Sequence, residues 1–585
     1  MSGAAGDLDP VTLTIIDNFL TSACRDMGVS MMRTAYSPIF NESLDFSCVA
    51  FDRAGRMLAQ AEFCPSQIGT IKFTVAWTID EIGLDHFQPG DVIVHNDPYR
   101  GSGHVPEHML LKPVFFDGEL FGFVANCAHM AEVGGKSAGG FSGDATDIFQ
   151  EGLRLPPVRL VAGGEDVADV WKIIMTNHRT PRVTEGDLRA MLGSLLLGER
   201  RLHELLATYG KATILQATEQ LMDVAERRMR REIAQIPDGE YTFEDVIEDD
   251  GVTPDPAVIR LRVVVRGDRL IADFTGSDRQ TRGPMNAIYA VTASAVYNAM
   301  LSLTDPTIPR NEGCYRPFTI IAPPGTLVNA VYPAPVVGGN TETSPRITDM
   351  VFAALASVLP ERVAASGGGT SSPVLFGGLN AKTGRYYAHF HFEGVGWGGR
   401  ASSDGNNMVV TINGNCRNTP VEVFENRYPP FLIEAYRLRT DSGGPGRQRG
   451  GLGGERIFTV VVPEIPLSAV LNRMKVAPWG LFGGEEGATG GIYIRRPNQT
   501  DWQTFQEAFG TASPSKFAGV VLRQGDQIRL TMPGGGGYGN PRERPVERVV
   551  RDVEEGFVSR EAARQYYGVE VVERDGGLEG TRVTT

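Results

Sequence analysis

The chain has 585 residues, of which 42% are hydrophobic and 22% charged, a composition typical of a globular protein larger than one core normally supports. Its formal net charge of -14 argues against nucleic acid as the main partner, because phosphate binding needs a basic surface. No apolar run reaches the roughly 18 residues of a membrane span, and the first residues do not resemble a secretory signal, so we expect a cytoplasmic protein with no membrane partner.

Cysteine, glycine and proline usage indicates a reduced protein with many shaped loops. The six cysteines are scattered without paired spacing, which is typical of buried thiols and not of a disulfide framework. The 70 glycines and 36 prolines gather in short phrases between strand-like runs. We therefore expect tight, ordered loops and no long flexible linker.

The first part of the chain, residues 1–235, is predicted to form an α/β lobe. Asp9, which is followed by proline, favours the start of a helix, and apolar residues then recur at helical spacing. Asp45 stands where a strand begins; an acid there is either a turn former or a ligand, and the pattern alone favours the turn. Two long helices, over residues 185–209 and 211–234, are expected to close the lobe.

The most unusual segment of this lobe runs from residue 94 to residue 132. It holds four of the nine histidines of the chain within a span of 35 positions, namely His95, His104, His108 and His129. Neutral imidazole and carboxylate are ligands that zinc, manganese and iron accept, so a metal site is one interpretation. The other is that these histidines cap turns and bond to backbone carbonyls. No HExxH or paired CxxC signature decides between the two.

The remainder of the chain is predicted to form a mixed α/β region, residues 236–370, and a mostly β region, residues 371–585. A hairpin is expected between residues 258 and 274. Further helices are expected over residues 294–303, 347–359, 544–555 and 559–567. Two glycine-rich phrases, 441–454 and 533–541, lack the P-loop and dinucleotide signatures, which leaves anion binding by their backbone N–H groups open. The fold class is therefore α+β, with several lobes of mixed sheets, long helices and many Gly/Pro-rich loops.

Eight phrases in a fixed order give the chain a resemblance to the hydantoinase B family. They occupy residues 41–51, 96–107, 129–135, 150–157, 308–317, 335–343, 441–454 and 533–541. That family includes one subunit of N-methylhydantoinase, half of 5-oxoprolinase, caprolactamase, and a large subunit of acetone and acetophenone carboxylases. The resemblance runs from Asp9 to about Val569 and implies a hydantoinase B-like fold.

The resemblance also implies a metal site. The ligands of the family, one Asp and two His, correspond to Asp45, His104 and His129. Such a set leaves coordination positions open, as catalytic sites do, and suits zinc, manganese or iron. The phrases of the family more often carry aspartate where this chain has Glu107 and Glu132. Both glutamates are therefore candidate catalytic residues, with ligation or support of a histidine as alternatives.

The resemblance implies that this chain is one half of an enzyme. In the family, ATP with Mg is bound by a separate hydantoinase A-type subunit. The expected function is that of the B-type subunit of a hetero-oligomeric, ATP-dependent hydantoinase, oxoprolinase or lactamase-like enzyme. The A-type subunit would phosphorylate a cyclic amide or imide, and this chain would hydrolyse it with metal assistance. The alternatives are a subunit of an ATP-dependent ketone carboxylase of the acetone or acetophenone type, and a non-catalytic scaffold subunit. The sequence identifies no substrate-binding residue.

Overall fold

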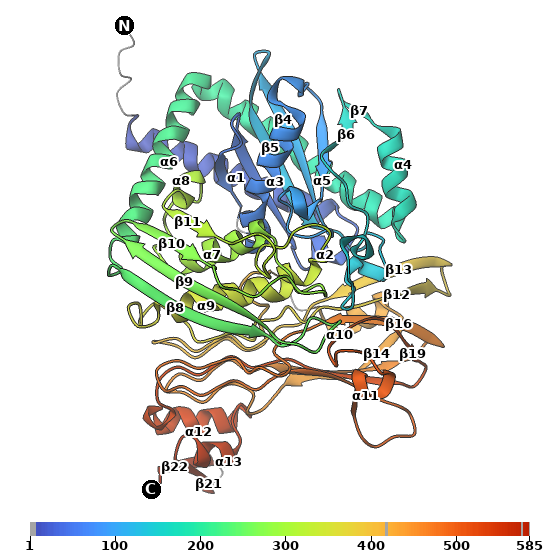
Figure 1. Cartoon of the computed structure of the whole chain (residues 1–585), viewed down its shortest axis with the longest axis vertical. Coiled ribbons are helices and arrows are strands. Elements are labelled where there is room, and N and C mark those ends of the chain that lie inside the picture. Colours follow the sequence, from blue (N-terminus) through green and yellow to red (C-terminus); the bar gives the residue numbers. More distant parts are fainter. Residues whose placement is uncertain (1–7, 62, 416–418, 575–576, 584–585) are drawn as a thin grey trace.

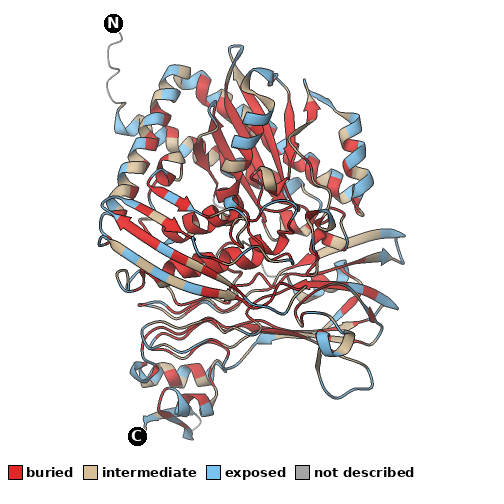
Figure 2. Cartoon of the chain, in the orientation of Figure 1, coloured by how far each residue is buried: buried red, intermediate tan, exposed pale blue. Residues whose placement is uncertain are grey.

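The computed structural model describes residues 8–61, 63–415, 419–574 and 577–583. Figure 1 shows the N-terminal sheet and its helices at one end of the long axis, a mixed layer in the middle, and the C-terminal sheets with a small terminal unit at the other end. In Figure 2, buried residues run through the strands, and exposed residues line the outer sides of the helices. None of the helices in these described residues is both long and apolar enough to cross a membrane.

A seven-stranded antiparallel sheet forms the centre of the N-terminal part, in the order β2-β1-β5-β4-β3-β6-β7. Its strands are β1 (Phe46–Asp52), β2 (Met57–Gln60), β3 (Val92–His95), β4 (Glu107–Phe116), β5 (Glu119–His129), β6 (Val158–Ala162) and β7 (Glu165–Asp166). The accompanying helices are α1 (Pro10–Thr34), α2 (Pro38–Asn41), α3 (Pro65–Ile82), α4 (Ala168–Asn177), α5 (Pro181–Tyr209) and α6 (Lys211–Ile233).

Helices cover both faces of this sheet. Because neighbouring strand residues point to opposite faces, Asn126 reaches α5, where it donates to Met191 O at 2.9 Å. Ser47 points the other way and donates to Cys64 O at the start of α3 at 2.9 Å. The expected N-terminus of α1 is confirmed, since Asp9 Oδ1 accepts from the backbone of Thr12 at 2.9 Å. The two long helices closing the lobe are confirmed as α5 and α6.

The middle layer is a four-stranded sheet with order β11-β10-β9-β8, packed with helices. The elements are β8 (Gly239–Ile247), β9 (Ala257–Arg266), β10 (Arg269–Asp273), α7 (Tyr289–Leu303), α8 (Glu312–Tyr315), β11 (Phe318–Ile321) and α9 (Ser344–Leu355). The expected hairpin is β9–β10, and the two expected helices are α7 and α9. A π-helical turn, η5 (Gly339–Thr343), leads directly into α9. Residues on both sides of position 235 contribute to one continuous hydrophobic core.

Two further sheets form a sandwich in the C-terminal part, in the orders β13-β12-β16-β19 and β14-β15-β20-β17-β18. The elements are β12 (Val374–Asn380), β13 (Arg385–His391), α10 (Val421–Arg427), β14 (Phe431–Leu438), β15 (Gly454–Val460), β16 (Glu464–Val470), β17 (Gly491–Arg495), β18 (Gln503–Thr504), α11 (Phe505–Phe509), β19 (Lys516–Arg523) and β20 (Gln527–Thr531). Side chains from both sheets, including Phe376, Phe458 and Leu467, share a second core.

A small terminal unit follows the sandwich. It contains α12 (Val546–Glu554), α13 (Arg560–Gln565), β21 (Val569–Arg574) and β22 (Gly577–Arg582) around its own apolar core. The two short helices were expected from the sequence, whereas the β21–β22 hairpin was not. The five cysteines of the described residues are all unpaired and buried, as expected; Cys416 lies outside the described residues.

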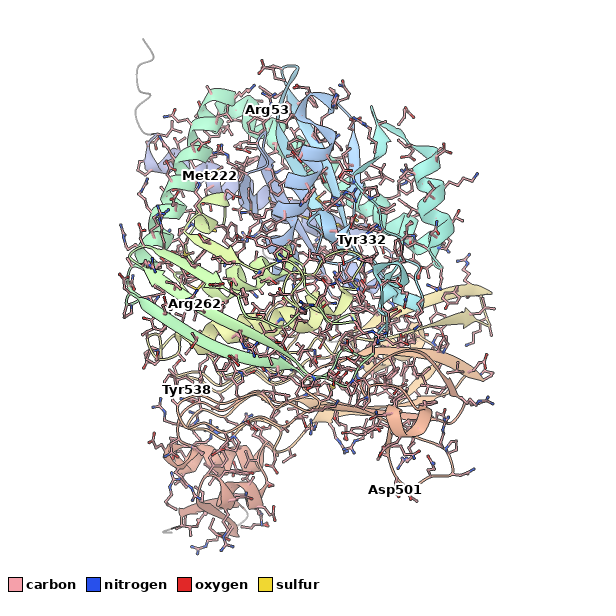
Figure 3. All side chains as sticks on the ribbon, in the orientation of Figure 1. Arg53, Met222, Arg262, Tyr332, Asp501 and Tyr538 are labelled. Atoms are coloured by element: carbon pink, nitrogen blue, oxygen red, sulfur yellow. The ribbon has the colours of Figure 1, made fainter. Side chains whose placement is uncertain are left out.

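Extended glycine-rich chains join the sandwich to the terminal unit, visible as wavy lines in Figure 1. Successive N–H groups of residues 534–537 donate to carbonyls of three different segments, at Ala488 and Glu485, at Gly451 and at Ser366. A Cβ at Gly534 would lie 1.7 Å from Ser442 O, so only glycine permits this approach. Tyr538, labelled in Figure 3, closes the layer by donating its hydroxyl to Pro360 O. Because neighbouring segments of the same chain accept hydrogen bonds from these N–H groups, anion binding by the phrase 533–541 is not supported.

Candidate metal and catalytic site

Antiparallel pairing brings the candidate residues to one edge of the seven-stranded sheet. β5 lies between β1 and β4, and Glu107 at the start of β4 pairs with His129 at the end of β5. Asp45 precedes β1 at the same edge, where its carbonyl accepts from the backbone N–H of His129 at 3.1 Å. His104 lies in the loop three residues before β4. Three strand ends therefore place two carboxylates and two imidazoles together.

An amide from the middle layer holds two of these groups. Asn340, on η5, donates through Nδ2 to Glu107 Oε1 at 2.6 Å and faces His104 Nδ1 at 2.9 Å. Glu107 and His104 are each only 1% exposed. Within the described residues, His104 Nε2 and Glu107 Oε2 have no hydrogen-bond partner. One nitrogen and one oxygen thus remain available to a ligand.

His129 has both ring nitrogens without a hydrogen-bond partner in the described part of the chain. Its ring stacks on Phe390 of β13, with centroids 4.5 Å apart, and lies 5.1 Å from the His104 ring. Burial is the main reason that the pKa of His129 lies well below its ordinary value, and His104 lowers it further. A neutral, buried imidazole without partners is suited to metal ligation, because its lone pair is not protonated.

Asp45 is oriented from α3. Gln67 Nε2 donates to Asp45 Oδ1 at 2.9 Å and to the Asp45 carbonyl at 3.2 Å. Burial, and then the nearby carboxylate of Glu107, raise the pKa of Asp45 to about 7. A cation beside Asp45 would stabilise its ionised form against both effects.

The four groups line one cavity of about 30 Å³, a volume suited to a water molecule or an ion. The rest of the lining includes Cys64, Ser66, Asn340, Thr341, Ser371, Phe392, Val410 and Asn413. As placed in the described residues, no three His, Cys, Asp or Glu side chains form a ready-made metal cluster, so binding would require them to turn toward one another. The donor chemistry nevertheless fits a divalent cation, since unpartnered imidazole nitrogens adjoin two carboxyl groups.

The model of the Hydantoinase B/oxoprolinase family matches residues 9–541 of the chain. The chain belongs to this family. It is 34% identical over 583 residues to the B-type subunit of a putative D-/L-hydantoinase from a Pseudomonas species, covering 97% of this chain and 96% of the relative. It is 32% identical to the beta subunit of the caprolactamase of Pseudomonas jessenii, covering 98% of both chains. These names imply that family members of this type work with a partner subunit.

Solved structures of relatives share the fold of this hydantoinase B-family chain. The crystal structure of the ATP-dependent caprolactamase of Pseudomonas jessenii superposes with a TM-score of 0.86 at 30% identity, covering 98% of both chains. A nucleotide-free acetone carboxylase superposes with a TM-score of 0.89, covering 98% of this chain and 81% of that one. At 20% identity, the second likeness concerns the fold alone. The expected hydantoinase B-like α+β fold is confirmed.

Glu132 is not brought to the cavity, contrary to the expectation for a catalytic carboxylate. It is fully buried and accepts from Arg179 Nη1 at 2.6 Å and from the backbone N–H of Gly134 at 2.9 Å. These bonds tie the segment after β5 to the segment before α5. The structure therefore gives Glu132 a positioning role in the hydantoinase B chain, and Glu107 is the glutamate that lines the site.

The histidine-rich segment divides into two groups. His104 and His129 line the cavity, whereas His95 and His108 lie elsewhere in the sheet. His95 pairs its Nδ1 with Thr78 Oγ1 at 3.1 Å, and His108 faces the ring of His178 at 5.9 Å. Burial lowers the pKa of both His95 and His108 to about 3. Both are neutral histidines outside the cavity, and His108, like His129, has neither ring nitrogen hydrogen-bonded within the described residues.

Sequence reasoning missed the residues that complete the site from distant parts of the chain. Gln67, Asn340 and Asn413 add amides, and Phe390 and Phe392 add the aromatic wall against His129. The run His389-Phe390-His391-Phe392-Glu393 alternates imidazole with phenyl, a pattern that predicts a two-faced strand. No sequence signal indicated that one face of that strand would meet His129.

Proposed function

We propose that this chain is the B-type subunit of an ATP-dependent enzyme that opens a cyclic amide or imide. The observation that carries the proposal is the buried cavity at the sheet edge. There, imidazole nitrogens without partners among the described residues adjoin Asp45 and Glu107. Buried polar groups without partners are rare in folded proteins and call for a ligand. The relatives named as hydantoinase and caprolactamase subunits support the reaction class.

Asp45, His104 and His129 are the residues proposed to hold a divalent metal, namely zinc, manganese or iron. When bound, such an ion polarises a carbonyl and lowers the pKa of water. Gln67 donates to Asp45, and Asn340 holds Glu107 Oε1, which lies 3.4 Å from His104 Nδ1 and can accept the Nδ1–H that ligation through Nε2 requires. Ligands supported in this way retain their orientation when substrate exchanges.

Glu107 is proposed as the proton acceptor for the attacking water. Its Oε1 is fixed by Asn340, while its Oε2 has no partner in the described residues. As the water oxygen bonds to the carbon that carries the phosphorylated oxygen, its proton passes to Glu107 and on to the ring nitrogen. The carbon–nitrogen bond then breaks, which leaves an amine and an acyl phosphate, and a second water releases inorganic phosphate and the carboxylate. Phe390 and Phe141 pack around His129 and limit the entry of bulk water.

ATP with Mg is assigned to a hydantoinase A-type partner subunit, which would phosphorylate the amide or imide oxygen before ring opening. The absence of a P-loop phrase in the chain supports this division. The relative described as an ATP-dependent caprolactamase supports the need for nucleotide, and the naming of its chain as a beta subunit supports a hetero-oligomer.

Ketone carboxylation is the second candidate; it is the activity named for a solved structure that shares this fold. That likeness carries no information on substrate, whereas the relatives at 32% and 34% identity are named for cyclic amides. A scaffold role is disfavoured, because a scaffold gains nothing from unpartnered buried ligands.

The experiment is elemental analysis of the co-purified complex of this chain with its A-type partner, beside ATP-dependent turnover of N-methylhydantoin, 5-oxoproline, caprolactam, and acetophenone with bicarbonate. About one metal ion per chain with turnover of a cyclic amide or imide is the expected result. Bicarbonate-dependent turnover of acetophenone alone would replace the proposal with the carboxylase. A metal-free, inactive complex would favour the scaffold.

A further inference from the structure

The end of strand β13 and the residues after it line a second cavity of about 210 Å³, which lies beside the cavity at the sheet edge. Phe390 belongs to the N-terminal core and stacks on His129. His389 and His391 point to the opposite face of the strand, toward the aromatic core of the sandwich. The two cavities share Phe392 and Val410 in their linings, so they adjoin.

A chain of four polar side chains runs along the second cavity. Arg456 Nε lies 2.6 Å from Glu393 Oε1, and the same oxygen lies 2.6 Å from His391 Nε2. His391 Nδ1 lies 3.3 Å from His389 Nε2. All four residues line the cavity. They therefore form a continuous relay from a buried guanidinium to an imidazole.

The protonation of this relay follows from its end group. Burial opposes ionisation of Glu393, but Arg456 and His391 outweigh it and lower the pKa of Glu393. An ionised carboxylate only accepts, so His391 donates through Nε2 and its Nδ1 is a bare acceptor. His389 then donates through Nε2, which leaves Nδ1 of His389 as an acceptor. Burial keeps the pKa of both histidines below the ordinary value.

Aromatic rings surround His389 on the sandwich side. Its ring lies 3.9 Å from that of Tyr428 and 5.5 Å from that of Phe424. The cavity beside these rings is large enough for a five- to seven-membered ring and too small for a nucleotide. Flat aromatic walls favour a flat ligand, and an imidazole acceptor at the wall favours an N–H donor on that ligand.

We infer that the second cavity binds a small planar ring carrying an N–H group, with Nδ1 of His389 accepting that N–H and His391, Glu393 and Arg456 fixing the orientation of His389. The substrate class follows from the proposed function, on which the inference rests for its connection to turnover. The ring bound here is the substrate before phosphorylation, because an O-phosphorylated lactam is an imidate with no N–H. The inference places the ring next to the cavity of Asp45, His104 and His129. It assigns His389 a binding role and the other three a positioning role.

A purely structural role for the relay makes a different prediction. Buried ion pairs often contribute little net stability. A stabilising role for the pair of Arg456 and Glu393 therefore does not explain why His391 and His389 continue the chain of contacts from Glu393. If the relay only fills space, replacing His389 by phenylalanine should leave ring binding unchanged. If His389 accepts an N–H, that replacement should weaken binding, and His389→Gln, which keeps an acceptor oxygen, should restore part of it.

The test is a saturation-transfer NMR titration of the full chain, without ATP or partner, using 2-pyrrolidinone and hydantoin. Their N-methylated counterparts, 1-methyl-2-pyrrolidinone and 1,3-dimethylhydantoin, lack the donor. Loss of one hydrogen bond should raise the Kd about fivefold to tenfold, both for the methylated rings on the native chain and for the N–H rings on His389→Phe. The matched control is His203→Ala, which removes a half-buried histidine of α5 that bonds to Phe115 O.

Equal affinity of N–H and N-methyl rings for the native chain, or no binding of either, overturns the inference. Native affinity in His389→Phe and His389→Ala also overturns it. Failure of the proposed function is a separate outcome. A complex that never turns over a cyclic amide, while the chain still binds N–H rings through His389, contradicts the function and supports the inference. A complex that turns over normally, with an unchanged KM in His389→Phe, supports the function and overturns the inference.

Discussion

Replacing Asn340 by leucine is the most direct perturbation of the site, because leucine keeps the branched shape and removes the amide. Asn340 makes a charge-assisted bond of 2.6 Å to Glu107 and a contact of 2.9 Å to His104. Such bonds contribute about 1 kcal/mol to a neutral partner and about 1.5–3 kcal/mol to a charged one. Only part of this free energy fixes the ligand geometry. We therefore expect the affinity for a divalent metal to fall about 10- to 100-fold, or about 1.4–2.8 kcal/mol.

The assay is a chelator competition titration of the purified chain with zinc, repeated with manganese. Thermal unfolding of each variant confirms that it is folded. The matched control is Asn329→Leu, which removes an amide that donates to Ala322 O at 2.7 Å and is absent from the cavity lining. A folded Asn340→Leu chain that binds zinc as tightly as the native chain would refute the reasoning. So would a native chain that binds neither metal.

Three further predictions concern groups outside the cavity. Asp245 bridges the buried Arg346 and Arg473 at 3.0 and 2.8 Å, so Asp245→Ala should destabilise the chain by about 3–5 kcal/mol. Asp278 pairs with Arg260 at an exposed site, so the control Asp278→Ala should cost under about 1 kcal/mol. Equal melting temperatures of the two variants would contradict this prediction. Glu132→Gln should lower the melting temperature, because the ion pair with Arg179 is lost. Activity per folded complex and metal content should stay near native values. Loss of activity in a folded complex would return Glu132 to the catalytic candidates. Burial raises the pKa of Asp349 from 3.8 to about 7, so its contribution to stability is present below about pH 4 and is lost as the pH rises through 7. The melting temperature of Asp349→Asn should therefore rise relative to that of the native chain between about pH 4 and pH 7. A difference in melting temperature that stays constant over this window would disprove the assignment.

The local elements were accessible from the sequence because their signals are local. Asp9 caps α1, and the leucine stripe of α5 packs as its spacing predicts, since helical periodicity and capping depend on neighbours within one turn. The hairpin β9–β10 formed where a turn interrupts an apolar run. The glycine-rich layer was not predicted, because its order comes from carbonyls on three separate segments and not from any pattern within one phrase.

The sequence by itself determined the family, the α+β class and the two histidines that line the cavity, His104 and His129. All of these follow from short sequence motifs that occur in a fixed order along the chain. Only the tertiary structure showed that Glu107, and not Glu132, lines the cavity. β4 and β5 place Glu107 opposite His129, whereas Arg179 holds Glu132 elsewhere. The same holds for Asn340 and for Arg456 of β15, which meets Glu393 from a remote part of the chain. Strand register and packing between layers determine such contacts, and neither is expressed in local residue order.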